Sequence, residues 1–309
     1  MNEKEQNDLT RILHDLKLGK NSFSEESDEI KNNKEIALAV IEDHPYSLQH
    51  CSERLCSDPE VVVLALNKNG NTLKYASESI RDNKELVLLA IENTGQALQY
   101  ASERLKNDKE VVLKTVKGFG WYICHANEAF CHDREVVIEA VKSKGVALEF
   151  ACPEFQKDKE IVWLAIQNDG LALEFAAPEF KNDKKYIVES LKNISHALEY
   201  ADDSFKNDKE IVTIAVNKDS RAIHYASEEL KSDKAFILKL IKDWQNDSSL
   251  KDFQITDRTK SLIKNINEDL SKDIGWHDPV KYLENAIMRD RLDNILPDKN
   301  NVIKNKNKV

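Results

Sequence analysis

Residues 83–107 read NKELVLLAIENTGQALQYASERLKN, and this stretch decides the fold because the chain repeats it with a fixed period. The opening motif, Asn-Lys-Glu, recurs in related form every 25 residues, and a position in the repeat is counted from its first residue. The repeat starts are Asn33, Asp58, Asn83, Asp108, Asp133, Asp158, Asp183, Asp208 and Asp233. Eight complete repeats fill residues 33–232 without an insertion, and the ninth drifts out of the pattern after about Trp244. Such a period predicts an array of small structural units.

The first half of each repeat predicts an amphipathic helix from position 2 to about position 12. A short acceptor side chain at position 1 can cap the free N–H groups of a helix, and Glu at position 3 suits the positive end of the helix dipole. Positions 4, 5, 8 and 9 are apolar or small, which is the spacing of one helical stripe. Position 13 is Gly in five repeats, from Gly70 to Gly170, and we expect a left-handed helix stop there.

The second half of each repeat predicts a shorter helix and then one more helical turn. Position 16 is Leu or Ile in all eight complete repeats, and position 18 is aromatic or His, as in Tyr75 and His125. We expect the position 18 side chains to pack inside. A hairpin this small cannot bury its own apolar face, so neighbouring repeats must bury it. The sequence therefore predicts an all-α solenoid, right- or left-handed, of about nine 25-residue helical-hairpin repeats.

The pattern divides the chain into four expected segments. They are a degenerate N-terminal cap repeat over 1–32, tandem repeats over 33–244, a non-repeat helical C-terminal cap or small module over 245–296, and a disordered tail over 297–309. In the first segment we expect a short helix over Leu9–Leu18, because counting back one period from Asn33 reaches Asp8. In the third we expect one helix over 262–270 and another that starts at Asp278.

Composition narrows the class of protein. The 309 residues are 41% hydrophobic and 32% charged, with a formal net charge of −10, so the chain can build a core. An acidic chain with few Arg argues against nucleic acid as a partner, and no apolar run approaches the roughly 20 residues of a membrane span. Five unevenly spaced cysteines do not indicate a disulfide framework. The start has no apolar signal-peptide core, so we expect a cytoplasmic protein.

The repeat Asp-Lys-Glu-Val-Val-Leu … Gly-x-Ala-Leu-x-Tyr-Ala-Ser-Glu-x-Leu-Lys-x-Asp resembles the DUF4116 family, and the resemblance covers about residues 33–244. That family is an uncharacterised helical repeat of bacterial, protist and viral proteins, including secreted effectors of intracellular bacteria. The resemblance implies a tandem helical repeat with an interaction role, and it carries no catalytic residues. It also suggests that the protein could be delivered into a host cell.

The fourth repeat, residues 108–132, differs most from the others. Phe119, Trp121 and Tyr122 replace the polar or small residues found at those positions elsewhere. Large aromatic side chains near a turn are typical interface anchors, although local repacking around two glycines is the structural alternative. Position 14 also varies strongly between repeats while the core positions stay fixed, which adds Leu171 and Arg221 as weaker binding candidates.

Other candidate sites are weaker. The four residues Cys124, His125, Cys131 and His132 suggest zinc, but their spacing matches no standard finger, so we expect no metal and no cofactor. A smaller group in the first repeat, His50 with Cys51 and Cys56, gives even less indication of a metal site. His277 and Asp278 are adjacent in sequence and seldom face each other, so we expect no catalytic residue. The charged residues around each repeat start are expected to be helix caps and weak ion pairs.

The sequence therefore favours a protein–protein interaction scaffold that binds a partner protein through its variable exposed surface. Two alternatives remain open at this point. One is a secreted bacterial effector that acts on host proteins. The other is an enzyme with its site in the C-terminal region or in a groove of the array.

Overall fold

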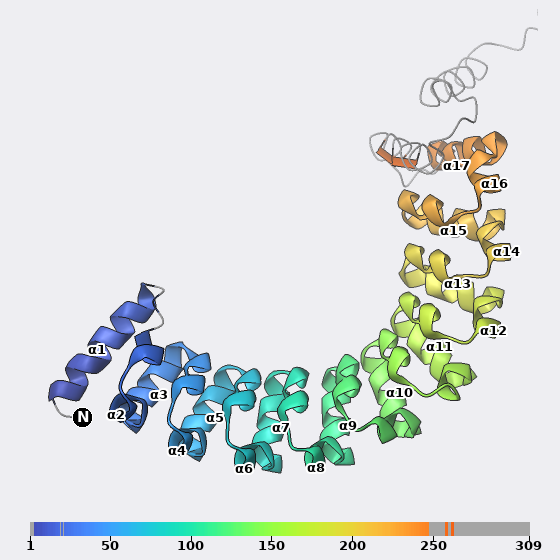
Figure 1. The fold of residues 1–309 in the computed structure, drawn as a ribbon. Coiled ribbons are helices and arrows are strands. Elements are labelled where there is room, and N and C mark those ends of the chain that lie inside the picture. Colours follow the sequence, from blue (N-terminus) through green and yellow to red (C-terminus); the bar gives the residue numbers. More distant parts are fainter. Residues whose placement is uncertain (1–2, 19, 21, 247–256, 259–260, 263–309) are drawn as a thin grey trace, which may run out of the picture. The chain divides into compact units, whose positions relative to one another are not determined.

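The computed structural model describes residues 3–18, 20, 22–246, 257–258 and 261–262, and it contains no strand among them. The chain divides into two compact units, residues 1–177 and residues 178–309 (Figure 1). Repeated helical elements make up the described part of both units, so the predicted all-α repeat array is confirmed.

The first unit begins with α1 (Glu3–Lys17), η1 (Ser22–Glu25) and α2 (Asp28–Lys31), where η denotes a 3-10 helix. Each repeat then supplies a ten-residue α-helix, a 3-10 helix and a short further turn. The ten-residue helices are α3 (Lys34–Asp43), α5 (Pro59–Lys68), α7 (Lys84–Asn93), α9 (Lys109–Gly118), α10 (Arg134–Ser143) and α11 (Lys159–Asn168). The 3-10 helices are η2 (Pro45–His50), η3 (Gly70–Tyr75), η4 (Gly95–Tyr100), η5 (Gly120–His125), η7 (Gly145–Phe150) and η9 (Gly170–Phe175). The short turns are α4 (Glu53–Cys56), α6 (Glu78–Arg81), α8 (Glu103–Lys106), η6 (Glu128–His132) and η8 (Phe155–Lys157).

The second unit continues the same order of elements. They are α12 (Pro178–Lys181), α13 (Lys184–Asn193), η10 (Ser195–Tyr200), α14 (Asp203–Lys206), α15 (Lys209–Lys218), η11 (Ser220–Tyr225), α16 (Glu228–Ser232) and α17 (Lys234–Asn246). The last of these has 13 residues and is longer than the ten-residue helices before it. The described helices of the chain include none that is both long and apolar enough to cross a membrane.

Neighbouring repeats pack in chain order. In the first unit, the ten-residue helices contact one another in the series from α3 through α5, α7, α9 and α10 to α11, and the 3-10 helices form a parallel series. In Figure 1 the short helices α4, α6 and α8 lie along one edge of this unit. The predicted apolar stripe is confirmed, because positions 4, 5, 8 and 9 of α5 are completely buried, and these are Val61, Val62, Ala65 and Leu66. Each repeat thus buries the apolar side of the next.

The residue at position 1 caps each ten-residue helix, as the sequence predicts. The carboxylate of Asp108 accepts the backbone N–H of Glu110 at 3.0 Å and that of Val111 at 3.3 Å. The amide oxygen of Asn33 accepts the N–H of Ile36 at 3.2 Å. A cap of this kind is worth roughly 1 kcal/mol to a helix, which sets where each one begins.

The glycines at position 13 do not form the expected left-handed stop. At Gly70, Gly95, Gly120 and Gly145 the backbone has no positive φ, so the predicted reason for these glycines is wrong. Instead, a Cβ at Gly70 would overlap the carbonyl of Ala90, and a Cβ at Gly120 would overlap the carbonyl of Ala140. Glycine is needed at Gly70, Gly120 and Gly145 because the 3-10 helix starts there in direct contact with a backbone carbonyl of the following repeat, whereas Gly95 makes room for the side chains of Phe119 and Tyr122.

An ion-pair ladder links successive repeats on the side where the ten-residue helices begin. At four junctions, the cation at position 2 pairs with the acids at positions 1 and 3 of the next repeat. Lys84 Nζ lies 2.8 Å from both Asp108 and Glu110, and Arg134 lies 2.6 Å from Asp158 and 2.5 Å from Glu160. The sequence predicts caps and weak pairs here, and the structure adds that the pairs join neighbouring repeats.

We expect acid to weaken this ladder. The hydrogen bond from Lys84 lowers the pKa of Asp108, and the hydrogen bond from Arg134 does the same for Asp158. A carboxylate with a lowered folded-state pKa stabilises the fold above its unfolded pKa of about 3.9, and that contribution disappears as pH falls through the folded value. The urea concentration at the midpoint of unfolding should therefore decrease when the pH is lowered below about 4. A Lys84→Met/Arg134→Met variant should show a smaller drop, and identical pH profiles would contradict the ladder's role.

The residues before α3 pack on the start of the array. The helix α1 begins at Glu3, earlier than the expected start near Leu9, and it packs on α3. Ile12 and Phe23 are fully buried in a cluster with Ile36 and Val40. The expected C-terminal module, its two helices and the tail lie outside the described residues, except for 245–246, 257–258 and 261–262.

Candidate interaction surface

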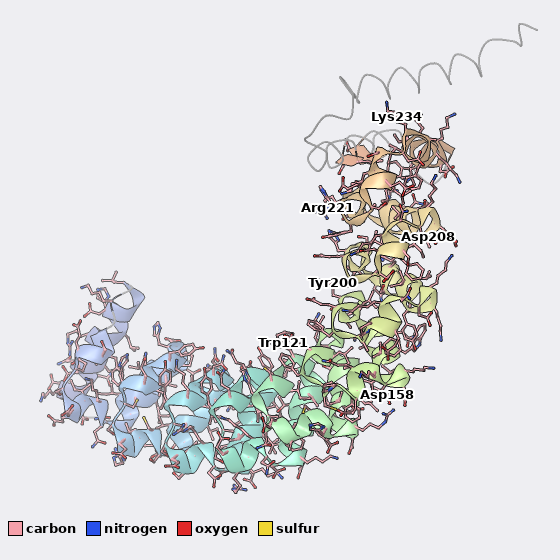
Figure 2. All side chains as sticks on the ribbon, turned by 45° about the vertical axis from the view of Figure 1, so that its right-hand side comes forward. Trp121, Asp158, Tyr200, Asp208, Arg221 and Lys234 are labelled. Atoms are coloured by element: carbon pink, nitrogen blue, oxygen red, sulfur yellow. The ribbon has the colours of Figure 1, made fainter. Side chains whose placement is uncertain are left out.

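Each 3-10 helix turns one side inward and the other outward. In η3, Gly70, Thr72 and Leu73 are buried, and these are positions 13, 15 and 16. Positions 14, 17 and 18 are half-buried or exposed in every 3-10 helix between residues 45 and 225. Residues three apart lie above one another in a 3-10 helix, so positions 14 and 17 share one side. We call this outward side the 3-10 surface, and Figure 2 shows Trp121 at that edge of the first unit and Asp158 at the opposite edge.

The aromatic residues at position 18 lie on this surface and not in the core. Tyr75, Tyr100, His125 and Phe150 are all half-buried, which corrects the expectation that this column packs inside. Tyr75 and Phe150 each contact a ring of the preceding repeat, whereas His125 stacks on Tyr122 of its own repeat. The sequence pattern could not distinguish these arrangements, because a half-buried aromatic column has the same spacing as a buried one.

Position 14 of one repeat meets position 18 of the next. The rings of Tyr46 and Tyr75 meet edge to face with centroids 6.4 Å apart. Trp121 and Phe150 meet in the same way at 4.8 Å. Such contacts hold a ring in one orientation without removing it from the surface. Tyr46 is not among the residues expected from the sequence, although an aromatic residue at position 14 followed 29 residues later by one at position 18 was the available signal.

Exposed apolar rings concentrate on the 3-10 surface. Large hydrophobic side chains that are more than a third exposed include Tyr46 at 41%, Trp121 at 41% and Phe119 at 37%. All three lie in the 3-10 helices or directly before one, whereas Leu18, at 61%, lies beyond the end of α1. A set of exposed rings on one surface is typical of a protein contact site.

In the fourth repeat, Phe119 packs with Tyr122, whereas Trp121 packs on Phe150 of the fifth repeat. The rings of Phe119 and Tyr122 lie 6.2 Å apart, and Tyr122 stacks on His125 with an interplanar angle of 19°. Both Phe119 and Tyr122 come within 2.6 Å of the place where a Cβ of Gly95 would be. The missing side chain of the preceding repeat therefore creates the room in which these two rings pack.

The two weaker candidates differ in their surroundings. Leu171 is half-buried at position 14 of η9 in the first unit, where its N–H donates to Asp169 at 3.1 Å. Arg221 belongs to the second unit and is exposed, but its guanidinium folds back onto Asp219 at 2.7 Å. The guanidinium of Arg221 is therefore already paired within its own repeat. Arg221 also belongs to a different unit from the three aromatic residues.

Cys124, His125, Cys131 and His132, considered above as a zinc set and set aside, do not converge as one group. Cys124 Sγ lies 3.7 Å from His125 Nδ1, but His132 lies with Cys152 and Glu154. Burial lowers the pKa of His125, so its imidazole is neutral where it stacks on Tyr122. Burial also raises the pKa of Cys51 to about 12, which keeps that thiol protonated and unreactive. His277 and Asp278 lie outside the described residues.

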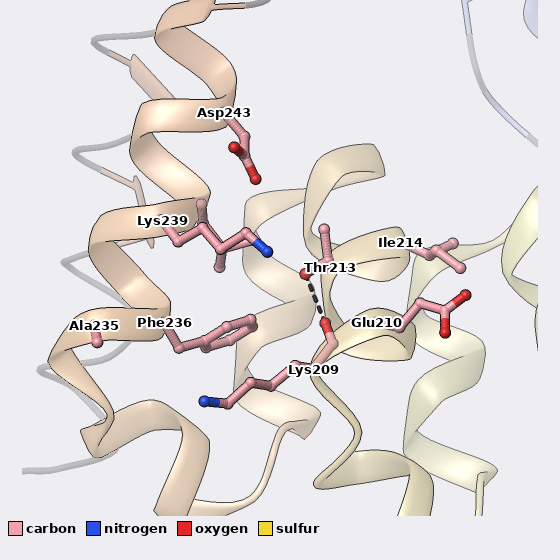
Figure 3. A pocket seen from close by; sticks show the side chains of 9 residues that line it. Lys209, Glu210, Thr213, Ile214, Ala235, Phe236, Lys239 and Asp243 are labelled. Atoms are coloured by element: carbon pink, nitrogen blue, oxygen red, sulfur yellow. Dashed lines mark hydrogen bonds between the residues drawn. The ribbon is translucent and has the colours of Figure 1, made fainter.

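The described part of the second unit has a cavity of about 650 Å³ between α15 and α17 (Figure 3). Its apolar lining includes Ile214 of α15 with Phe236 and Leu240 of α17. The hydroxyl of Thr213 donates to the Lys209 carbonyl at 2.6 Å, so it is already engaged. The nine side chains that line the cavity include no His or Cys, and their arrangement does not suggest a nucleophile with its base.

Comparison with known families gives one result. The family model described as a domain of unknown function, DUF4116, matches residues 33–81, 83–130, 108–156, 158–206, 183–229 and 208–253. These overlapping matches follow the 25-residue period that the structure shows. No curated protein and no solved structure matches the chain significantly.

Proposed function

The chain belongs to the DUF4116 family of helical repeats, and from that premise we propose that it is a scaffold that binds a partner protein through the 3-10 surface of its first unit. The observation that carries the proposal is the concentration of exposed rings, Tyr46, Phe119 and Trp121, along that surface. A partner segment with apolar side chains would cover these rings and remove them from water, which is the main source of affinity at most protein contacts.

The rings are suited to binding because they are held in place before a partner arrives. Trp121 rests on Phe150, and Phe119 rests on Tyr122, which itself stacks on His125. Ordering a free side chain on binding costs about 0.5–1.5 kcal/mol, and a ring that is already packed avoids most of that cost. Aromatic residues in such positions are frequent hot spots.

The repeat architecture supports recognition by varied side chains on a constant backbone. At position 14 the first unit displays Tyr46, Asn71, Gln96, Trp121, Val146 and Leu171. Position 16 of the same 3-10 helices is always a buried Leu or Ile, which anchors the backbone that presents position 14. The amide of Asn71 donates to Gln96 at 3.0 Å, which gives the surface a polar stretch between its two aromatic ends.

Trp121→Ala is expected to weaken partner binding at least about tenfold, since truncating a hot-spot residue costs about 2 kcal/mol or more and each 1.4 kcal/mol corresponds to a factor of about ten. The free energy of unfolding should fall by about 1 kcal/mol at most, because the ring is exposed and mainly loses its edge contact with Phe150. A partner captured by cross-linking would be purified, and its dissociation constant measured by calorimetry with both variants.

Leu18→Ala is the matched control, because Leu18 is a large exposed hydrophobic residue outside the 3-10 surface. It should leave both affinity and stability unchanged. The proposal would be overturned if Trp121→Ala bound as tightly as the unchanged protein, or if Leu18→Ala weakened binding to the same degree. A large loss of stability in Trp121→Ala would instead make Trp121 part of the core.

A further inference from the structure

A three-residue constellation recurs at the junctions between repeats. The side chain at position 25 of one repeat meets the side chain at position 20 of the next. The hydroxyl of Ser52 donates to Asn32 at 2.7 Å, and that of Ser227 donates to Asn207 at 2.5 Å. The backbone sets this meeting, because the N–H at position 20 donates to the carbonyl at position 24 of the preceding repeat, as Ser52 does to Lys31 at 3.0 Å.

Position 22 of the following repeat completes the constellation. Arg54 Nε donates to Asn32 Oδ1 at 2.9 Å, and Arg104 Nε donates to Asp82 Oδ1 at 3.0 Å. In the second unit, Glu229 occupies the same position and accepts from Asn207 Nδ2 at 3.0 Å. The repeat backbone therefore directs three side chains from two repeats toward one point, whatever their chemistry.

At the junction of the fourth and fifth repeats, all three positions carry metal-binding residue types. Position 25 is His132, position 20 is Cys152 and position 22 is Glu154. The backbone contact is unchanged, since the N–H of Cys152 donates to the Cys131 carbonyl at 3.1 Å. One ligand atom from each of the three residues lies within 4.8 Å of the other two.

We propose that His132, Cys152 and Glu154 form a zinc site that joins the fourth and fifth repeats. Zinc binds imidazole nitrogen, thiolate sulfur and carboxylate oxygen at about 2.0–2.3 Å, and water fills the fourth tetrahedral position when a protein supplies three ligands. The thiolate favours zinc over magnesium or calcium, which prefer oxygen ligands alone.

The surroundings of the three side chains fit this role. Cys152 is 4% exposed and fixed, whereas His132 and Glu154 are exposed and can rotate to close the remaining gap to the metal. Glu128 and Cys131 are close to the site in sequence, but they are not among the residues whose ligand atoms converge. The site shares no residue with the proposed interaction surface, because His132 ends η6 and both Cys152 and Glu154 lie between η7 and η8.

The test uses the purified full chain after removal of metal with a chelator. Calorimetric titration with zinc chloride should show that one zinc ion binds per chain. Replacement by Co²⁺ should give a thiolate-to-metal charge-transfer band and the intense visible bands of a tetrahedral site. Cys152→Ser and His132→Asn should each weaken zinc binding by about 100-fold or more, since both remove a direct ligand.

Ser and Asn occupy positions 20 and 25 at the first junction, so neither substitution should disturb the fold. The thermal midpoint of each metal-free variant should therefore match that of the metal-free parent. Cys131→Ser is the matched control, and it should bind zinc as the parent does. The proposal is overturned if the parent shows no saturable zinc binding, if Cys152→Ser binds as tightly as the parent, or if Cys131→Ser loses binding equally.

Discussion

Gly120→Ala is expected to destabilise the first unit by about 1–3 kcal/mol, the usual range for forcing an extra methyl group into a packed interior. The new Cβ would overlap the carbonyl of Ala140 and lie 3.0 Å from the backbone nitrogen of Lys144. Both contacts are with backbone atoms of the fifth repeat, which cannot rotate away as a side chain can. The start of η5 would have to move, and its N–H bond to Ser143 Oγ, now 3.1 Å, would lengthen.

Gly118→Ala supplies a matched control two residues away. Gly118 ends α9, and a Cβ there would meet no atom within 4 Å. Alanine should therefore stabilise the protein by about 0.4–1 kcal/mol, because it reduces the conformational freedom of the unfolded chain. Urea unfolding followed by circular dichroism would measure both variants. Shifts of the same sign at the two glycines would contradict the close backbone approach at Gly120.

Leu98→Ala is expected to have the largest effect, a loss of about 2–5 kcal/mol in the free energy of unfolding. Leu98 is fully buried at position 16 of η4 and belongs to the core that runs through the first three repeats and into the fourth. Removing its side chain leaves a cavity between the two neighbouring repeats. These repeats cannot fill the cavity because each is also packed against a further repeat.

Leu18→Ala makes the same chemical change at a residue that is 61% exposed, and it should shift the unfolding free energy by about 0.5 kcal/mol at most. Hydrogen exchange would add a spatial test. Protection in Leu98→Ala should fall first in the repeats beside η4, because repeats in such an array are stabilised by their immediate neighbours. Equal losses of stability in the two variants would show that position 16 is not part of a continuous core.

Several features of the structure could be predicted from local sequence alone. The helix starts follow from Asp or Asn at position 1, since a cap such as Asp108 bonds backbone groups only two and three residues away. The buried stripe follows from the spacing of residues such as Val111 and Val112 along one helix. The aromatic set of the fourth repeat could also be found, because Phe119, Trp121 and Tyr122 stand out against the seven other complete repeats.

Other features could not be predicted because they arise between repeats. The sequence alone indicates a helix stop at Gly120, whereas in the structure glycine is required there by the contact with the carbonyl of Ala140. The half-burial of Phe150 depends on Trp121 in the preceding repeat. The meeting of His132 with Cys152 and Glu154 joins residues that are 20 and 22 positions apart, so the local spacing of cysteines and histidines pointed to the wrong partners.

The sequence by itself determined the period, the starts of the ten-residue helices and the apolar stripe of each, because each of these depends on neighbours within about one or two helical turns. Only the tertiary structure decided which side chains from different repeats meet, and therefore where glycine is required, which rings remain exposed and which ligands converge. The physical reason is that those contacts depend on how closely one repeat stacks on the next, and that distance is set by all the buried side chains together rather than by any local pattern.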